Sequence, residues 1–233
     1  MLLAAPALAQ ELSVDLGGDN TLSLRSVQLL LLITVLSIVP GLAVMVTCFP
    51  FIVTVLSILR QAIGLQQAPP NMLIISLALF LTWYIMDPVF TEAWLTGIQP
   101  MTEGKMEVGP ALQAAIQPFR VFMAARVDAD TLLALQDLRA SSGAPVGGGV
   151  VAEVPLSILM PSFLLSEIQR AFEIGFMIFL PFLIIDLVVA AILMSMGMMM
   201  VPPAVVSLPF KLAFFVVADG WALVSGALVR SYF

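Results

Sequence analysis

The sequence predicts an all-α membrane protein with about four apolar helical segments, arranged as kinked helical hairpins, and a small extracytoplasmic helical insert. Of the 233 residues, 61% are hydrophobic and 10% are charged, whereas soluble globular chains have about 45–50% apolar and about 25% charged residues. No charged residue occurs from Ser26 to Leu59, which is longer than the ~20 apolar residues that cross a bilayer as a helix. From Ile174 to Phe210 the one charged residue is Asp186.

The first nine residues, 1–9, resemble the end of a secretory signal peptide. Ala7-Leu8-Ala9 fits the small-x-small pattern that precedes cleavage. A hydrophobic N-terminus without cleavage is the alternative. Cleavage would place the polar, mostly acidic residues 11–25 outside the cytoplasm, and the same orientation places the insert described below on the outer side.

The N-terminal apolar region, residues 10–86, is predicted to contain two membrane spans, over residues 27–49 and 72–86. We expect Pro40 to kink the first span and Pro50 to break it near its end, because proline removes a helical hydrogen bond. A second helical piece continues after that break. We expect Asn71 to cap the second span and Asp87-Pro88 to end it with a charge and a helix breaker.

Residues 87–153 form a polar insert with eight acidic and four basic residues. Because basic residues prefer the cytoplasmic side of a membrane, this acidic insert suits an extracytoplasmic position. Two helices are expected in it: Pro110 opens the first, with Leu112 and Met123 on one apolar face, and Thr131 caps the second. A glycine-rich linker at 141–149 ends the insert.

Residues 154–233 predict a helical hairpin whose second segment runs from Ala204 to about Val229. With the tip at residues 198–199, Asp186 and Lys211 are each 12 to 13 residues away, which is roughly 19 Å along a helix. A lone charge at mid-membrane costs about 2.5–3.5 kcal/mol. We therefore predict an intramembrane ion pair between these two residues, within one chain or between neighbouring copies. The alternative is that each caps a helix end at an interface.

Methionine is concentrated at the hairpin tip. Five of the 14 methionines lie within seven residues: Met194, Met196, Met198, Met199 and Met200. Soft, unbranched side chains suit a deformable seal, whereas an ordinary hydrophobic turn is the plain alternative. Copper binding by thioethers is disfavoured, because three consecutive methionines cannot all face one ion on a helix.

Three charges, Glu167, Arg170 and Glu173, are spaced to share a helix face and to pair with one another. Two carboxylates on one helix can suggest acid–base catalysis. Because an arginine lies between them, a self-neutralised or intersubunit ion pair is the favoured interpretation.

The composition excludes several classes of function. The chain has no histidine and one cysteine, Cys48, which removes histidine-based catalysis, Cys/His zinc sites and internal disulfides. With a net charge of −6 and no cluster of basic residues, the sequence has no positively charged segment that would bind nucleic acid. We predict no catalytic residue, no metal site and no cofactor. A small-solute transporter would need internal repeats, which we do not find. A paired-aspartate intramembrane enzyme is disfavoured because Asp186 and Asp219 lie at different depths.

With these motifs in place, the chain resembles the FliP family of flagellar export-gate membrane proteins and its counterpart in virulence-type type III secretion. The resemblance covers nearly all of residues 22–233. It is densest in the segments Ser166–Phe176, Phe179–Val188, Met194–Pro203, Leu208–Leu212 and Ala68–Thr82.

The resemblance implies a ring of five copies, joined by two other small membrane proteins, that forms a pore in the flagellar basal body at the bacterial inner membrane. Unfolded flagellar proteins would pass through it. The family's pore gasket corresponds to Met196, Met198, Met199 and Met200, its intramembrane acid and base to Asp186 and Lys211, and a further glutamate to Glu167. The alternative is the equivalent subunit of a virulence-type injectisome.

Overall fold

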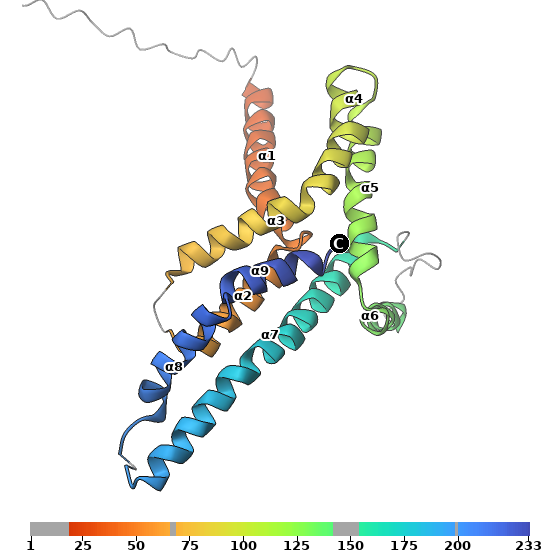
Figure 1. Ribbon diagram of the computed structural model, residues 1–233. Coiled ribbons are helices and arrows are strands. Elements are labelled where there is room, and N and C mark those ends of the chain that lie inside the picture. The colour runs from red at the N-terminus through yellow and green to blue at the C-terminus, as the bar shows by residue number, and fades with distance from the viewer. Residues whose placement is uncertain (1–18, 66–68, 142–153, 199) are drawn as a thin grey trace, which may run out of the picture. The chain divides into compact units, whose positions relative to one another are not determined.

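The computed structural model describes residues 19–65, 69–141, 154–198 and 200–233, and these fold into helices joined by turns (Figure 1). The predicted signal remnant, nearly all of the glycine-rich linker and Met199 lie outside the described residues. In chain order the elements are α1 Asp19–Met45, α2 Phe49–Ile63, α3 Asn71–Ala93, the π-helical turn η1 Trp94–Ile98, α4 Gln99–Thr102, α5 Val108–Arg126, α6 Ala129–Ser141, α7 Leu156–Ser195, α8 Pro203–Val217 and α9 Gly220–Arg230.

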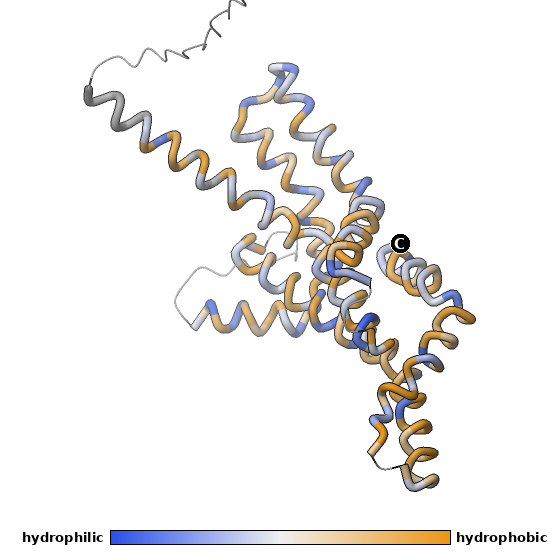
Figure 2. The backbone as a smooth tube through the Cα atoms, turned by 90° about the vertical axis from the view of Figure 1, so that its left-hand side faces the viewer, coloured by the Kyte–Doolittle hydropathy of each residue, from blue (hydrophilic) through white to orange (hydrophobic). Residues whose placement is uncertain are grey.

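Three helical stretches are long and apolar enough to cross a membrane: Ser26–Met45, Asn71–Thr102 and Leu156–Ser195. Helices α8 and α9 give a fourth such stretch if the bent pair is counted as one span. Figure 2 shows hydrophobic residues along most of the α7–α8 hairpin and hydrophilic residues at the far end of the α4–α5 hairpin. The predicted all-α membrane fold class is confirmed.

The described residues divide into two compact units, one up to residue 42 and the other from residue 43 onward. In the first unit, α1 contains Pro40 in its interior, and from Val27 onward its apolar residues occupy every face. A helix that is hydrophobic all round suits a lipid or protein-interior environment rather than the surface of a soluble domain.

In the second unit, α2 forms the centre of the core. Its buried residues recur every three or four positions, so that one face is fully covered: Phe51, Ile52, Val55, Leu56, Leu59, Ala62 and Ile63. This face packs against α7, α3 and α8. The break that the sequence placed at Pro50 lies just before α2, and Pro50 occupies its first turn, where the absent N–H costs no helical hydrogen bond.

Gly175 allows α2 and α7 to approach closely. A Cβ atom at this position would lie 2.4 Å from Cδ1 and 3.1 Å from Cγ2 of Ile58 on α2. Because real Cβ atoms do not tolerate such contacts, any larger residue at position 175 must displace Ile58 or separate the two helices.

Helix α3 does not end at Asp87-Pro88, as the sequence suggested. It continues with Pro88 inside it to Ala93, and the π-helical turn and α4 extend it to Thr102. Proline removes one hydrogen bond, and packing of α3 on α5, including the Phe90–Phe119 ring contact, holds the helix together. The predicted boundary at residue 87 therefore falls within a helix.

Helix α5 meets the π-helical turn through small residues, while Met123 at the other end of the predicted apolar face is buried against Leu159 and Phe163 of α7. Ala111 and Ala115 are buried against Gly97 of the π-helical turn, whereas Leu112 is 58% exposed. A Cβ at Gly97 would lie 2.6 Å from the Ala111 carbonyl oxygen and from Ala115 Cβ. Close backbone approach, rather than large apolar side chains, thus sets this contact.

Two predicted helix caps differ in the structure. Asn71 does not cap α3: its side-chain oxygen accepts a hydrogen bond from Arg60. At α6, Asp128 rather than Thr131 is the acceptor, and its Oδ1 takes hydrogen bonds from the backbone N and the hydroxyl of Thr131, both at 2.9 Å. These bonds lower the pKa of the Asp128 carboxyl, the backbone bond contributing most.

The predicted single segment from Ala204 to Val229 is two helices. Between α8 and α9 the chain bends by 60°, and Asp219 adopts a left-handed conformation with φ of 47°. At the neighbouring Gly220, a Cβ would lie 2.1 Å from the ring of Phe215. The bend therefore depends on a glycine that lets the chain turn against this aromatic ring.

We expect Gly175→Ala to lower the midpoint of thermal unfolding of the purified chain in detergent. Overpacking costs about 1–3 kcal/mol and outweighs the gain in helix propensity, which is up to ~1 kcal/mol. Adding Ile58→Val, which removes the Cδ1 atom in the clash, should recover part of the loss. Gly226→Ala is the matched control, because its Cβ meets nothing closer than 3.7 Å. A Gly175→Ala variant as stable as the wild type would contradict this account.

Candidate functional site: the α7–α8 hairpin

The tip of the hairpin presents methionine side chains. Helix α7 ends at Ser195, and Gly197, with φ of 74°, makes the left-handed turn. The backbone N–H of Gly197 donates to Met194 O, and that of Met198 donates to Leu193 O, a pattern that satisfies the last carbonyls of a helix. The exposed fractions of the described tip methionines are Met194 62%, Met196 65%, Met198 38% and Met200 97%.

The structure brings Asp186 and Lys211 together. Lys211 Nζ lies 2.6 Å from Asp186 Oδ2, joining α8 to α7 within one chain. The lysine side chain is 7% exposed and the aspartate side chain 31%. The second aspartate oxygen, Oδ1, accepts a hydrogen bond of 2.5 Å from the Ser207 hydroxyl. The pair is therefore a hydrogen-bonded network that connects the two arms of the hairpin.

Lys211 also connects the hairpin to α2. Its Nζ donates to the carbonyl oxygen of Ala62 at 3.1 Å, in the last turn of α2. Unpaired carbonyls give the C-terminus of a helix a partial negative charge, which a cation there stabilises. The ammonium group thus joins α2, α7 and α8 at one point.

Sequence reasoning identified neither Ser207 nor the Ala62 carbonyl. Ser207 is four residues before Lys211, so the two share a face of α8, and this spacing was an available signal. The Ala62 carbonyl carries no signal in the sequence, because any residue in the last turn of α2 would offer the same group.

Glu167, Arg170 and Glu173 have different surroundings. Glu167 is 0% exposed, and its Oε1 lies 3.5 Å from Arg170 Nη1 and 3.0 Å from Arg126 Nε. Glu173 instead accepts a hydrogen bond from Gln169, and among the described residues no ion pair joins it to Arg170. The sequence placed Glu167 on a helix face with its two neighbours; in the structure it is enclosed within its own chain, because the insert supplies Arg126.

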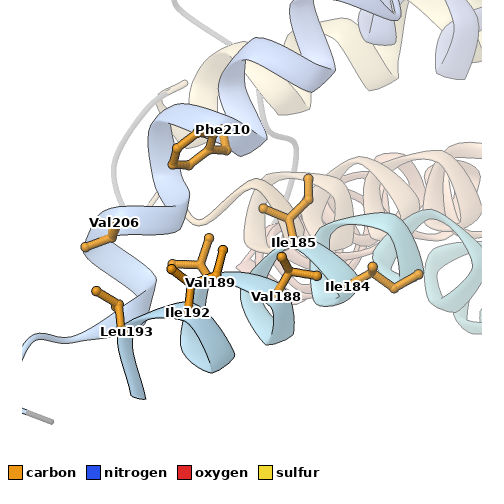
Figure 3. A pocket seen from close by; sticks show the side chains of 8 residues that line it. All are labelled: Ile184, Ile185, Val188, Val189, Ile192, Leu193, Val206 and Phe210. Carbon is orange, nitrogen blue, oxygen red and sulfur yellow. The ribbon is translucent and has the colours of Figure 1, made fainter. Parts of the chain in front are cut away.

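An apolar pocket of about 390 Å³ lies between α7 and α8 (Figure 3). Eight aliphatic and aromatic side chains line it: Ile184, Ile185, Val188, Val189, Ile192, Leu193, Val206 and Phe210. No group of three His, Cys, Asp or Glu residues in the described part of the chain could hold a metal ion. The pocket between the two arms is thus lined by apolar side chains alone.

These features define an integral membrane protein whose distinctive region is a helical hairpin with a thioether-rich tip and a partly buried ion pair between its arms. The chain belongs to the FliP family, whose family model matches residues 32–228.

Relatives named flagellar biosynthetic protein FliP are similar to most or all of this chain. One from Caulobacter vibrioides is 50% identical over 232 residues, which cover 99% of this chain and 86% of the relative. One from Agrobacterium fabrum is 46% identical, with 100% and 96% covered. One from Bacillus subtilis is 44% identical, with 89% and 92% covered.

We expect Asp186→Ala and Lys211→Ala each to lower stability more than the double variant Asp186→Leu/Lys211→Met. Removing one partner leaves a buried charge unpaired, which costs about 3–5 kcal/mol at fully buried sites and less here, whereas replacing both partners by apolar residues is often near neutral. Thermal unfolding in detergent measures the effect. Asp219→Asn, at an exposed carboxylate, is the control and should match the wild type. Single variants as stable as the double variant would refute the pairing energetics.

Proposed function

We propose that this chain is a pore-forming core subunit of the bacterial flagellar type III protein export gate, required for flagellum assembly and for export of unfolded flagellar proteins. The proposal rests on one combination of observations. The chain is similar along its length to proteins named flagellar biosynthetic protein FliP, and it exposes methionines at the tip of an apolar hairpin.

The tip methionines are the proposed pore gasket: Met196, Met198, Met199 and Met200. Thioether side chains are flexible and polarisable, and they conform to surfaces of varied shape. A ring of them can close on itself when the pore is empty and adapt to a passing polypeptide of any sequence. The exposed position of the three described methionines supports this role.

The exposed face of α7 supports a homo-oligomer, for which we propose five copies joined by two other small export-gate membrane proteins. This face carries large apolar side chains that its own chain leaves uncovered, namely Phe172, Phe176, Met177, Ile184 and Leu187. Patches of this kind mark protein or membrane contacts. We place the assembly in the flagellar basal body at the bacterial inner membrane, with the insert, residues 87–153, on the outer side.

The subunit acts as a passive conduit and carries out no enzymatic step. The carboxylate at the hairpin, Asp186, already accepts bonds from Lys211 and Ser207, so it serves as a structural counter-charge. The residue's role is to hold the hairpin in shape while substrates pass at the tip.

Replacing Met198–Met200 by alanine should make the membrane permeable to small solutes while flagellar export continues. Alanine shortens the gasket side chains, which lie between the end of α7 and the start of α8, and leaves both helices unchanged. Single-channel conductance of the reconstituted gate and cell motility measure the two effects. Met72→Ala, at an exposed methionine of α3, is the control. Unchanged conductance would remove the gasket role.

Purifying the chain with the products of neighbouring genes should yield a complex containing several copies of it and two other membrane proteins. We expect this complex because the uncovered apolar face of α7 is stabilised by contact with other apolar surfaces rather than with water. Native mass spectrometry measures the composition, and recovery of the chain only as a monomer would contradict the assembly.

A further inference from the structure

Tyr232 follows α9 and lies where α2, α5 and α7 meet. Its ring stacks on Phe122 of α5, with centroids 6.0 Å apart and planes at 13°. It meets Phe51 of α2 edge-on, with centroids 5.6 Å apart. The guanidinium of Arg126, the last residue of α5, lies 4.0 Å from the ring centroid. A single side chain thus touches two helices through its ring alone.

The Tyr232 hydroxyl reaches the third helix. It donates a hydrogen bond to Oε2 of Glu167 on α7, while Oε1 accepts from Arg126 Nε at 3.0 Å. Because the Glu167 side chain is 0% exposed, its charge depends on protein partners alone. Burial, and then the negative charge of Glu167, raise the pKa of the tyrosine hydroxyl, which therefore keeps its proton and donates.

Arg126 also contacts the segment that follows α9. Its Nη1 donates to the backbone carbonyl of Ser231 at 2.8 Å. Its Nη2 is buried and has no hydrogen-bond partner among the described residues, and the face of the Tyr232 ring lies 4.0 Å from the guanidinium carbon. A cation over an aromatic face is attracted by the ring quadrupole, and more strongly where water is excluded.

We propose that Tyr232 is a positioning residue that latches the insert helix α5 and the segment after α9 onto the core formed by α2 and α7. We call Tyr232, Arg126, Glu167 and the Ser231 carbonyl the Tyr232 latch. With the latch open, Glu167 lacks one donor, Arg126 lacks its aromatic cover, and the core beneath them is reachable by solvent. The effect on gate assembly rests on the function proposed above, whereas the latch itself does not.

Cys48 is a built-in reporter of latch opening. It is the one cysteine of the chain, is 0% exposed, and belongs to the same core cluster as Phe51 and Tyr232. A maleimide can react with it only after local opening, so the labelling rate measures the population of the open state.

The experiment measures N-ethylmaleimide labelling of Cys48 in the purified full-length chain in detergent. Tyr232→Leu removes the ring and the hydroxyl, and we expect labelling about tenfold faster or more, because a hydrogen bond to a charged group and the packing of an aromatic ring are both lost. Tyr232→Phe keeps the ring and should give an intermediate rate. Tyr84→Leu is the matched control, since it replaces the other tyrosine, which is exposed on α3, and should label at the wild-type rate.

An unchanged rate in Tyr232→Leu overturns the latch. If that variant is not recovered in folded form, Tyr232→Phe decides the matter, and a wild-type rate there overturns it equally. A double-mutant cycle separates the latch from general loss of packing: Tyr232→Phe should accelerate labelling severalfold in the wild-type background and hardly at all beside Glu167→Leu. Equal acceleration in both backgrounds overturns the assignment of the hydroxyl to Glu167.

Motility of cells that carry each variant separates the latch from the export function. Faster labelling with impaired motility supports both the latch and its role in the gate. Faster labelling with normal motility supports the latch and overturns its role in the gate. Because labelling is measured on the isolated chain, its outcome stands even if the chain serves a different assembly.

Discussion

Two ion pairs, both built on α7 and each with one buried member, hold the core helix α2 in place. Glu167 pairs with Arg126 beside the start of α2, and Asp186 pairs with Lys211 at its end. The two carboxylates are 19 residues apart on α7, about 28 Å along the helix. Buried charges are tolerated only when paired and hydrogen-bonded. In a chain with so few charges, these two points therefore determine which surfaces can meet, and apolar packing fills the space between them.

The two pairs differ in how far the sequence predicts them. Asp186 and Lys211 belong to one hairpin, so equal distances from the tip place them at equal depth, and the structure joins them. Arg126 and Glu167 are 41 residues apart, and they meet only because the fold of the insert brings the end of α5 against α7. That path depends on small-residue packing between α5 and the π-helical turn, which no charge pattern in the sequence indicates.

The same contrast applies to the helices. Long apolar runs predict how many helical segments exist, because backbone N–H and C=O groups inside a membrane must form their hydrogen bonds within the helix. Helix ends are set by tertiary contacts instead. Pro88 lies inside α3 because packing on α5 outweighs one lost hydrogen bond, whereas the predicted last span breaks at Asp219 because Gly220 turns against Phe215. Neither outcome follows from local propensity.

The hydrogen bond from Lys211 to Ala62 joins residues that are 149 positions apart, and this separation has a consequence for biosynthesis. At about 5–20 residues per second, the ribosome adds Lys211 about 7–30 s after Ala62. During that interval α2 is already made, yet its last turn lacks the cation that completes it. The core of this protein therefore closes late in translation, only after the C-terminal hairpin has been made.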